Sequence, residues 1–419
     1  MELILPSHDA NRADDMRKLI HLFYVFKALF FRAIVFFPFE CCGYLNPWGA
    51  LSKNPKKRIA FQAYNPQTAQ VFIPIVNELK EQADLEIWFI VMFHPYHGLR
   101  GLIETKAFAI KELGIEPNKL LFIWESYWRK FDALVCSDVY AKFPVKKTKK
   151  LIIPHGAGLL SRWVVKSPLR KTVSDFDAYL LCGDFDLLQV KDRLHGKTEL
   201  HRVGFPFVDC LFHDAPRSGL PAHTAAVKAD NKKVVLYAPS WGHTYSYGDI
   251  LTRNIMEVMA CLRDKAVIVL LKLHAASYIP AQAKGILWRK KINQYLDRDQ
   301  VKIITELDDR PFFKTADVLI TDISSRSFNF MITGKPVIVY GVPDHYSESV
   351  VESMRIKKIF EGAYRANTPS ELSSMLDRCL QNPHEMARQQ QKVVKDLFTN
   401  PGCAASRTAR VIRQVVDET

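Results

Sequence analysis

Short apolar runs rich in β-branched residues alternate with helix-like stretches along most of this chain, and this alternation restricts the possible fold more than any other feature. An apolar run of four to eight residues without polar alternation is typical of a strand buried on both faces. Strands separated by helices predict a parallel, doubly wound sheet. The first series of predicted strands covers residues 58–63, 85–92, 120–123, 133–136, 151–154 and 179–182.

A second series of predicted strands covers residues 234–238, 267–273, 301–305, 318–323 and 337–340. Between the two series, residues 212–231 are rich in Ala, His, Pro and charge and have no apolar period, which indicates an interdomain linker. A chain of 419 residues is also too long for one ordinary core. We therefore predict an α/β protein with two Rossmann-like domains that face each other across a cleft.

The predicted domain plan has four parts. They are an N-terminal segment (1–50), an N-terminal Rossmann-like domain (51–211), a C-terminal Rossmann-like domain (232–385) and C-terminal helices that cross back (386–419).

The unit from residue 318 to 340 predicts a strand, a serine-rich helix start, a helix and a second strand. Asp322, Ser324 and Ser325 lie at the carboxyl end of the first strand, and Gly334 can end the helix with a positive φ. Hydroxyls and backbone N–H groups at a helix start favour a phosphate or another anion. The alternative is that Asp322 or Ser324 only caps the helix.

The net charge of +14 and the cysteine pattern limit the partners and the compartment. The charge points to an anionic partner, such as a membrane surface, a nucleotide substrate or a nucleic acid. Eight cysteines without a Cys-x-x-Cys pair favour a reducing cytoplasm and give no sign of a structural zinc site.

An aromatic apolar run spans residues 19–39 and is interrupted by His21, Lys27 and Arg32. A helix that spans the bilayer would place Lys27 or Arg32 near its middle, and the free-energy cost of inserting each cation is about 2.5 to 3.5 kcal/mol. We therefore expect a helix that lies in the membrane interface, with its cations reaching anionic lipid phosphates. The alternative is a core or interdomain helix.

Four motifs follow predicted strands at their carboxyl ends, where a parallel sheet presents residues to a cleft. They are IIPHGAG, VLYAPSWG, LLKLHAA and VLITDISS. The glycines of the first motif permit a ligand to approach the backbone closely. The candidate site residues are His155, Gly156, Gly158, Ser240, Trp241, Lys272, His274, Asp322, Ser324 and Ser325.

Together, these motifs resemble the CDP-glycerol glycerophosphotransferase family, which includes teichoic acid primases and polymerases. The resemblance covers residues 151–340 and includes GFP with Asp209 after it, YAPSW, LKLH, and TDISS followed by KPVIVY. It implies a GT-B fold that transfers glycerol phosphate from CDP-glycerol to a hydroxyl, usually on a lipid-linked acceptor at the cytoplasmic membrane face. In such a fold, residues 51–211 would form the acceptor domain and residues 232–385 the nucleotide-donor domain. The chain departs from the family pattern at Ala157, Gly158, Gly242 and Ala275, where members commonly carry Thr, Pro, Arg and Pro.

The residue types support roles in phosphate transfer. His155 suits a general base, because imidazole titrates near neutral pH. His274, Ser324 and Ser325 suit phosphate binding without a metal or another cofactor. Asp322 is expected to orient His274 or to cap the helix. Trp241 is expected either to stack on a cytosine or to form a packed wall of the cleft.

Three other functions compete with this interpretation. A GT-B glycosyltransferase with a nucleotide-sugar donor would serve capsule or lipopolysaccharide synthesis, but residues 326–330 lack the carboxylate that commonly binds ribose. A sugar-nucleotide 2-epimerase would carry an Asp-Ser-Gly-Gly turn where this chain has Asp322 to Ser325. A non-catalytic membrane-binding or nucleic-acid-binding protein fits the charge, but no dedicated nucleic-acid motif is present.

Overall fold

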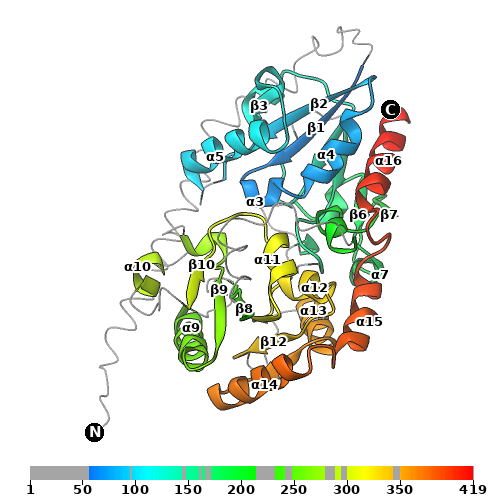
Figure 1. Cartoon of the computed structure of the whole chain (residues 1–419). Helices are drawn as coiled ribbons and strands as arrows, with labels where there is room; N and C mark the ends of the chain where they lie inside the picture. Colours follow the sequence, from blue (N-terminus) through cyan, green and yellow to red (C-terminus); the bar gives the residue numbers. More distant parts are fainter. Residues whose placement is uncertain are drawn as a thin grey trace, which may run out of the picture.

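Two parallel β-sheets form the frame of the molecule (Figure 1). The computed structural model describes residues 56–94, 97–143, 148–159, 163–165, 171–213, 232–240, 248–278, 288–293, 300–342 and 350–418. The predicted interfacial helix at 19–39 and nearly all of the predicted linker lie outside these ranges. None of the helices within them combines the length and apolar character needed to cross a bilayer.

The first sheet has seven strands in the order β3-β2-β1-β4-β5-β6-β7, and every recorded pairing is parallel. Its inner strands are almost entirely buried, as their apolar sequences predict. The strands are β1 (Lys57–Ala63), β2 (Leu85–Val91), β3 (Leu120–Phe122), β4 (Ala133–Cys136), β5 (Lys149–Ile152), β6 (Ala178–Leu181) and β7 (Glu199–Arg202). The associated helices are α3 (Pro66–Ala69), α4 (Phe72–Lys80), α5 (Gly98–Lys111), α6 (Ile123–Ser126) and α7 (Asp184–Val190).

The second sheet has six parallel strands in the order β10-β9-β8-β11-β12-β13. The strands are β8 (Lys233–Tyr237), β9 (Val267–Leu271), β10 (Val301–Ile303), β11 (Val318–Thr321), β12 (Val337–Tyr340) and β13 (Tyr364–Ala366). The helices are α9 (Gly248–Arg263), α10 (Trp288–Asn293), α11 (Arg310–Thr315), α12 (Arg326–Met331), α13 (Val350–Glu361), α14 (Pro369–Gln381), α15 (Ala387–Leu397) and α16 (Ala404–Asp417).

Both sheets reverse their strand order once, between β1 and β4 in the first and between β8 and β11 in the second. In open α/β sheets, the carboxyl ends of the strands on either side of such a switch point form a ligand crevice. The doubly wound prediction is therefore correct for both sheets. Several predicted strands were one or two residues too long at their carboxyl ends, because the chain leaves the sheet there to form the site.

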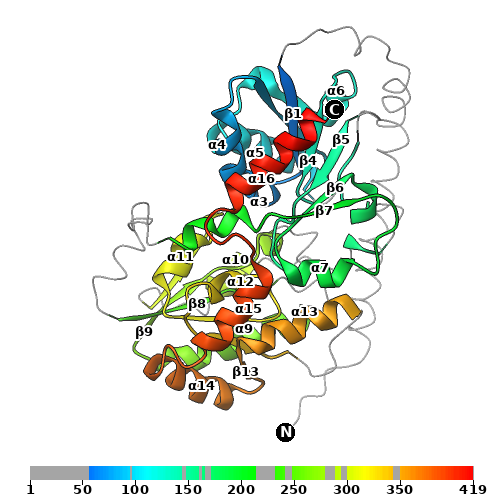
Figure 2. The ribbon, with the colours of Figure 1, turned by 90° about the vertical axis from the view of Figure 1, so that its right-hand side faces the viewer.

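The last helix, α16, crosses from the second sheet back to the first (Figure 2). Asp209, in the short helix Pro206–Leu211, accepts hydrogen bonds from the backbone N–H groups of Ala404 (3.1 Å) and Ala405 (2.8 Å) at the start of α16. Gly204 has φ +96°, and a Cβ atom there would lie 2.2 Å from the Thr399 carbonyl oxygen. The GFP motif with its following aspartate thus attaches this returning segment to the first domain.

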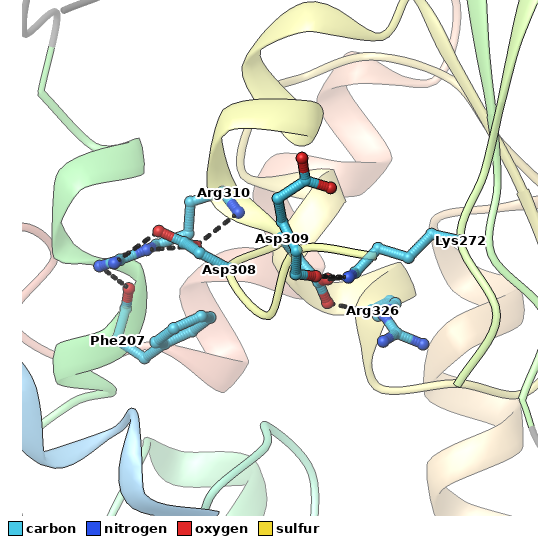
Figure 3. Close-up of polar contacts among 7 residues, drawn as sticks. Phe207, Lys272, Asp308, Asp309, Arg310 and Arg326 are labelled. Carbon is cyan, nitrogen blue, oxygen red and sulfur yellow. Dashed lines mark hydrogen bonds and ion pairs between the residues drawn. The ribbon is translucent and has the colours of Figure 1, made fainter. Parts of the chain in front are cut away.

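Arg310, the first residue of α11, joins the two domains from the other side. Its guanidinium pairs with Asp308 at 2.8 Å, donates to the Phe207 carbonyl at 3.2 Å and lies 4.6 Å from the centre of the Phe207 ring (Figure 3). These contacts join α11 of the second domain to the short helix that follows β7 of the first.

Candidate functional site

His155 follows β5, and its Nδ1 atom lies 2.7 Å from the Ser137 carbonyl oxygen. Because a carbonyl only accepts hydrogen bonds, Nδ1 carries the proton and Nε2 keeps its lone pair in the neutral ring. The Asp138 carboxylate lies 3.5 Å from the same Nδ1 atom. The backbone after β4 thus fixes the tautomer that a general base requires.

Gly156 and Gly158 bring the His155 loop against α12 of the second domain. A Cβ atom on Gly156 would lie 3.1 Å from Ser325 Oγ, and one on Gly158 would lie 2.9 Å from the Phe328 ring. Gly158 also has φ +77°, a conformation that glycine adopts without strain. Ser325 and Phe328 belong to the second domain, so the two glycines let the domains approach closely beside His155.

His274 follows β9, and its Nδ1 atom accepts a hydrogen bond from the backbone N–H of Ala276 at 3.1 Å. Burial, followed by the positive charge of Arg326, lowers the pKa of His274 to about 3. His274 is therefore neutral at physiological pH, with a proton on Nε2 that it can donate. The charge of His155 also contributes to this low pKa, so the two imidazoles lie within electrostatic reach across the domains.

Beside His274, one carboxylate holds two buried cations. Asp309 lies 3.1 Å from Lys272 Nζ through Oδ1 and 2.7 Å from Arg326 Nε through Oδ2 (Figure 3). Burial raises the pKa of Asp309, but Arg326 and Lys272 outweigh that effect and lower it. The group of Lys272, Asp309 and Arg326, here called the cation triad, therefore carries a net charge of about +1 next to a neutral imidazole.

Asp322 and Ser240 meet at the switch point of the second sheet. Asp322 Oδ2 accepts hydrogen bonds from the Ser240 backbone N–H at 2.9 Å and from its hydroxyl at 2.6 Å. Burial raises the pKa of Asp322. Asp322 thus fixes the strand end that carries Ser240, whereas we expected it to orient His274 or to cap the helix.

Ser324 and Ser325 lead into α12, which is only six residues long. Ser324 Oγ accepts a hydrogen bond from the Arg326 backbone N–H at 3.3 Å, whereas Ser325 makes no side-chain cap bond. The Ser325 hydroxyl instead faces Gly156 across the domains. Trp241, the remaining predicted site residue, lies outside the described residues.

Three side chains of the site were not predicted: Asp138, Asp309 and Arg326. Asp138 follows β4 and Asp309 follows β10, so both obey the strand-end rule that found the other motifs. Arg326 was considered only as part of a helix. Within the described residues, no three His, Cys, Asp or Glu side chains gather in a way that could hold a metal ion.

Comparison with known proteins supports the family resemblance. The family model of CDP-glycerol:poly(glycerophosphate) glycerophosphotransferase matches residues 169–416, more than half of the chain. The chain belongs to this family. The match contains the cation triad and His274, whereas His155 precedes it. A curated relative, the teichoic acid glycerol-phosphate primase of Bacillus subtilis (strain 168), is 22% identical over 209 residues. That alignment covers 46% of this chain and about half (50%) of the primase.

Solved structures support the fold of this glycerophosphotransferase family member. The wall teichoic acid polymerase TagF matches with a TM-score of 0.60 at 16% identity, over 96% of this chain and 98% of the other. A putative UDP-N-acetylglucosamine 2-epimerase from Listeria monocytogenes matches with a TM-score of 0.58 at 12% identity, over 87% and 98%. The two parallel sheets therefore have a GT-B-like arrangement.

Proposed function

We propose that this protein transfers glycerol phosphate, or a related polyol phosphate, from a CDP-activated donor to a hydroxyl group of a lipid-linked or glycan acceptor, with release of CMP. Family membership supports the reaction class. The H444N variant of TagF has been soaked with CDPG, which supports the same donor class here. The acceptor and the place of action, the cytoplasmic face of a bacterial membrane, belong to the proposal, as does a role in surface-glycopolymer synthesis.

The donor diphosphate would bind above the cation triad. Lys272 and Arg326 share one carboxylate, so an anion that approaches them gains electrostatic stabilisation in a partly dehydrated site. The terminal nitrogens of Arg326 point away from Asp309 (Figure 3), and a donor phosphate would contact them there. The Nε2–H group of neutral His274 would donate to a phosphate oxygen, and the Ser324 and Ser325 hydroxyls would add further donors. Ser240, held by Asp322, would contact the donor from the neighbouring strand end.

The acceptor would be activated by His155. Its Nε2 atom takes the proton of the acceptor hydroxyl as the oxygen attacks the phosphorus that carries glycerol. The bond from that phosphorus to the bridging oxygen breaks, and CMP leaves with the electron pair. The products are a new phosphodiester, CMP and a proton on His155 that passes to solvent. The charge that develops on CMP lies on the side of the cation triad.

One observation carries this proposal: two imidazoles with opposite hydrogen-bonding roles lie within electrostatic reach of each other in the two domains. His155 presents a lone pair because the Ser137 carbonyl takes its Nδ1 proton. His274 presents a proton because Nδ1 accepts from Ala276. Transfer of a phosphate group to a hydroxyl requires a base near the hydroxyl and a hydrogen-bond donor near the phosphate, and His155 and His274 suit these two roles.

The test uses His155→Ala and release of CMP from CDP-glycerol. Loss of a positioned base should lower the rate by about 10²- to 10⁴-fold, with donor affinity in calorimetry unchanged because the cation triad remains. His201→Ala is a matched control, since His201 pairs with Glu199 on the edge strand β7. A His155→Ala rate above about one tenth of wild type would exclude the base role.

The donor class is tested with the wild-type chain and a panel of CDP-alcohols and UDP-sugars. Release of CMP from CDP-glycerol without release of UDP is the expected result. Release of UDP without CMP would instead establish a nucleotide-sugar glycosyltransferase. Tight binding to liposomes without turnover of any donor would establish a non-catalytic membrane protein.

A further inference from the structure

A buried carboxylate lies at the switch point of the first sheet. Asp138 follows β4, is only 4% exposed and accepts a hydrogen bond from the Tyr64 hydroxyl at 3.1 Å. Tyr64 follows β1, the strand beside β4, and its ring stacks on His94 at 4.6 Å. A carboxylate buried to this degree is costly unless a nearby group stabilises its charge.

The same carboxylate oxygen lies 3.5 Å from His155 Nδ1. The Ser137 carbonyl already receives the Nδ1 proton at 2.7 Å and sets the tautomer. Asp138 therefore acts on His155 through charge rather than through the tautomer. An opposite charge within about 4–6 Å raises the pKa of an imidazole, usually by 1–3 units.

We propose that Asp138 is a positioning residue that raises the basicity of His155 and stabilises the imidazolium formed when His155 takes the acceptor proton. The inference rests on the function proposed above. The acceptor O–H bond breaks, an N–H bond forms at Nε2, and the positive charge on the ring lies beside the Asp138 carboxylate. The proton does not move to Asp138 before it passes to solvent, and Tyr64 holds the carboxylate in place.

Other charged or titratable groups surround the pair of His155 and Asp138. His274, at the end of β9, interacts electrostatically with His155, and Tyr64 contacts Asp138. Lys272 and Arg326 add positive charge at His274, and positive charge there opposes protonation of His155. The Asp138 carboxylate acts in the opposite direction and favours protonation of His155.

The test is the pH dependence of kcat/KM for CMP release by Asp138→Asn. This profile rises with pH as the base of the free enzyme loses its proton. Removal of the carboxylate should move the ascending limb to lower pH by about one unit. The plateau rate should also fall, because a less basic imidazole accepts the proton less readily.

Two further variants separate positioning from a structural effect. Tyr64→Phe removes the hydroxyl that holds the Asp138 carboxylate, so its ascending limb should also move to lower pH, by less than that of Asp138→Asn. Asp177→Asn is a matched control, since Asp177 accepts from the Lys150 backbone N–H at the opposite end of β5. Its profile should match wild type. A shift to lower pH in Asp138→Asn and Tyr64→Phe, but not in Asp177→Asn, supports the inference.

The failures of the two proposals are distinguishable. If His155→Ala retains turnover, the proposed base is wrong. If His155→Ala is inactive but the limb of Asp138→Asn stays at the wild-type pH, Asp138 does not position His155 and the proposed function stands. If Asp138→Asn does not fold, a Tyr64→Phe limb that stays at the wild-type pH overturns the inference.

Discussion

Substitution of Asp309 by Asn tests the cation triad most directly. The change keeps the side-chain shape but leaves Lys272 and Arg326 without their shared carboxylate. The side chains of Asp309, Lys272 and Arg326 are 13%, 6% and 10% exposed, so water solvates the two cations poorly after the carboxylate is lost. Removal of one partner from a buried ion pair costs about 3–5 kcal/mol in unfolding free energy. At about 2–4 °C per kcal/mol for a domain of this size, the melting temperature should fall by roughly 6–20 °C.

The assay is thermal unfolding followed by circular dichroism, with Glu104→Gln as the control. Glu104 pairs with Arg100 at 2.6 Å, but those side chains are 46% and 84% exposed. An exposed pair of this kind contributes about 0–1 kcal/mol. Equal shifts for the two variants, or a shift below about 2 °C for Asp309→Asn, would show that the triad does not stabilise the fold as reasoned.

The difference in stability between wild type and Asp309→Asn should depend on pH and on a bound anion. Because the pKa of Asp309 is lowered in the folded state, its stabilisation is present near neutral pH and is lost as pH falls below its unfolded pKa, near 4. The wild-type advantage over Asp309→Asn should therefore shrink at low pH. Inorganic pyrophosphate should raise the melting temperature of the variant more than that of wild type, because two uncompensated cations then meet the anion. Equal increases would contradict the proposed donor site.

Two further predictions concern the donor and the membrane. Ser324→Ala combined with Ser325→Ala should weaken donor affinity in calorimetry, because two hydroxyl donors are removed; unchanged affinity would show that these serines serve only local structure. Deletion of residues 1–45 should shift much of the protein to the soluble fraction while sparing turnover of a water-soluble acceptor analogue, because hydrophobic burial and anionic-lipid attraction both depend on that segment. If the truncated chain still pellets with membranes, another surface docks it, and if it does not fold, the segment belongs to the core.

Most of the strands were predictable from sequence, whereas the edge strands β7 and β13 were not. The predicted strands 58–63 and 234–238 correspond within one residue to β1 and β8, because strands covered on both faces must be apolar throughout. β7 has the sequence ELHR and is largely exposed, and β13 has only three residues. Neither strand carries an apolar pattern, so pairing to a neighbouring strand alone defines it.

The site was predictable where a motif lies directly after a strand, as at His155 and His274. The partners of those residues were not predicted, because their roles depend on contacts between distant parts of the chain. Asp309 gains its importance only when Lys272, which follows β9, and Arg326 converge on it. Asp322 shows the same limit, because nothing in its motif indicates that Ser240, rather than His274, would be its partner.

The return of α16 to the first domain affects how the chain can fold during synthesis. Ile412 and Val416 on this helix belong to the same hydrophobic core as Phe72 and Ile75 of α4. The ribosome synthesises the α4 residues more than three hundred residues before the α16 residues. The first domain therefore emerges early with one apolar face uncovered, and the face is sealed only when residues 404–417 have been made. Exposure of such a face during translation favours chaperone binding, and it couples the completion of both domains to a single late event.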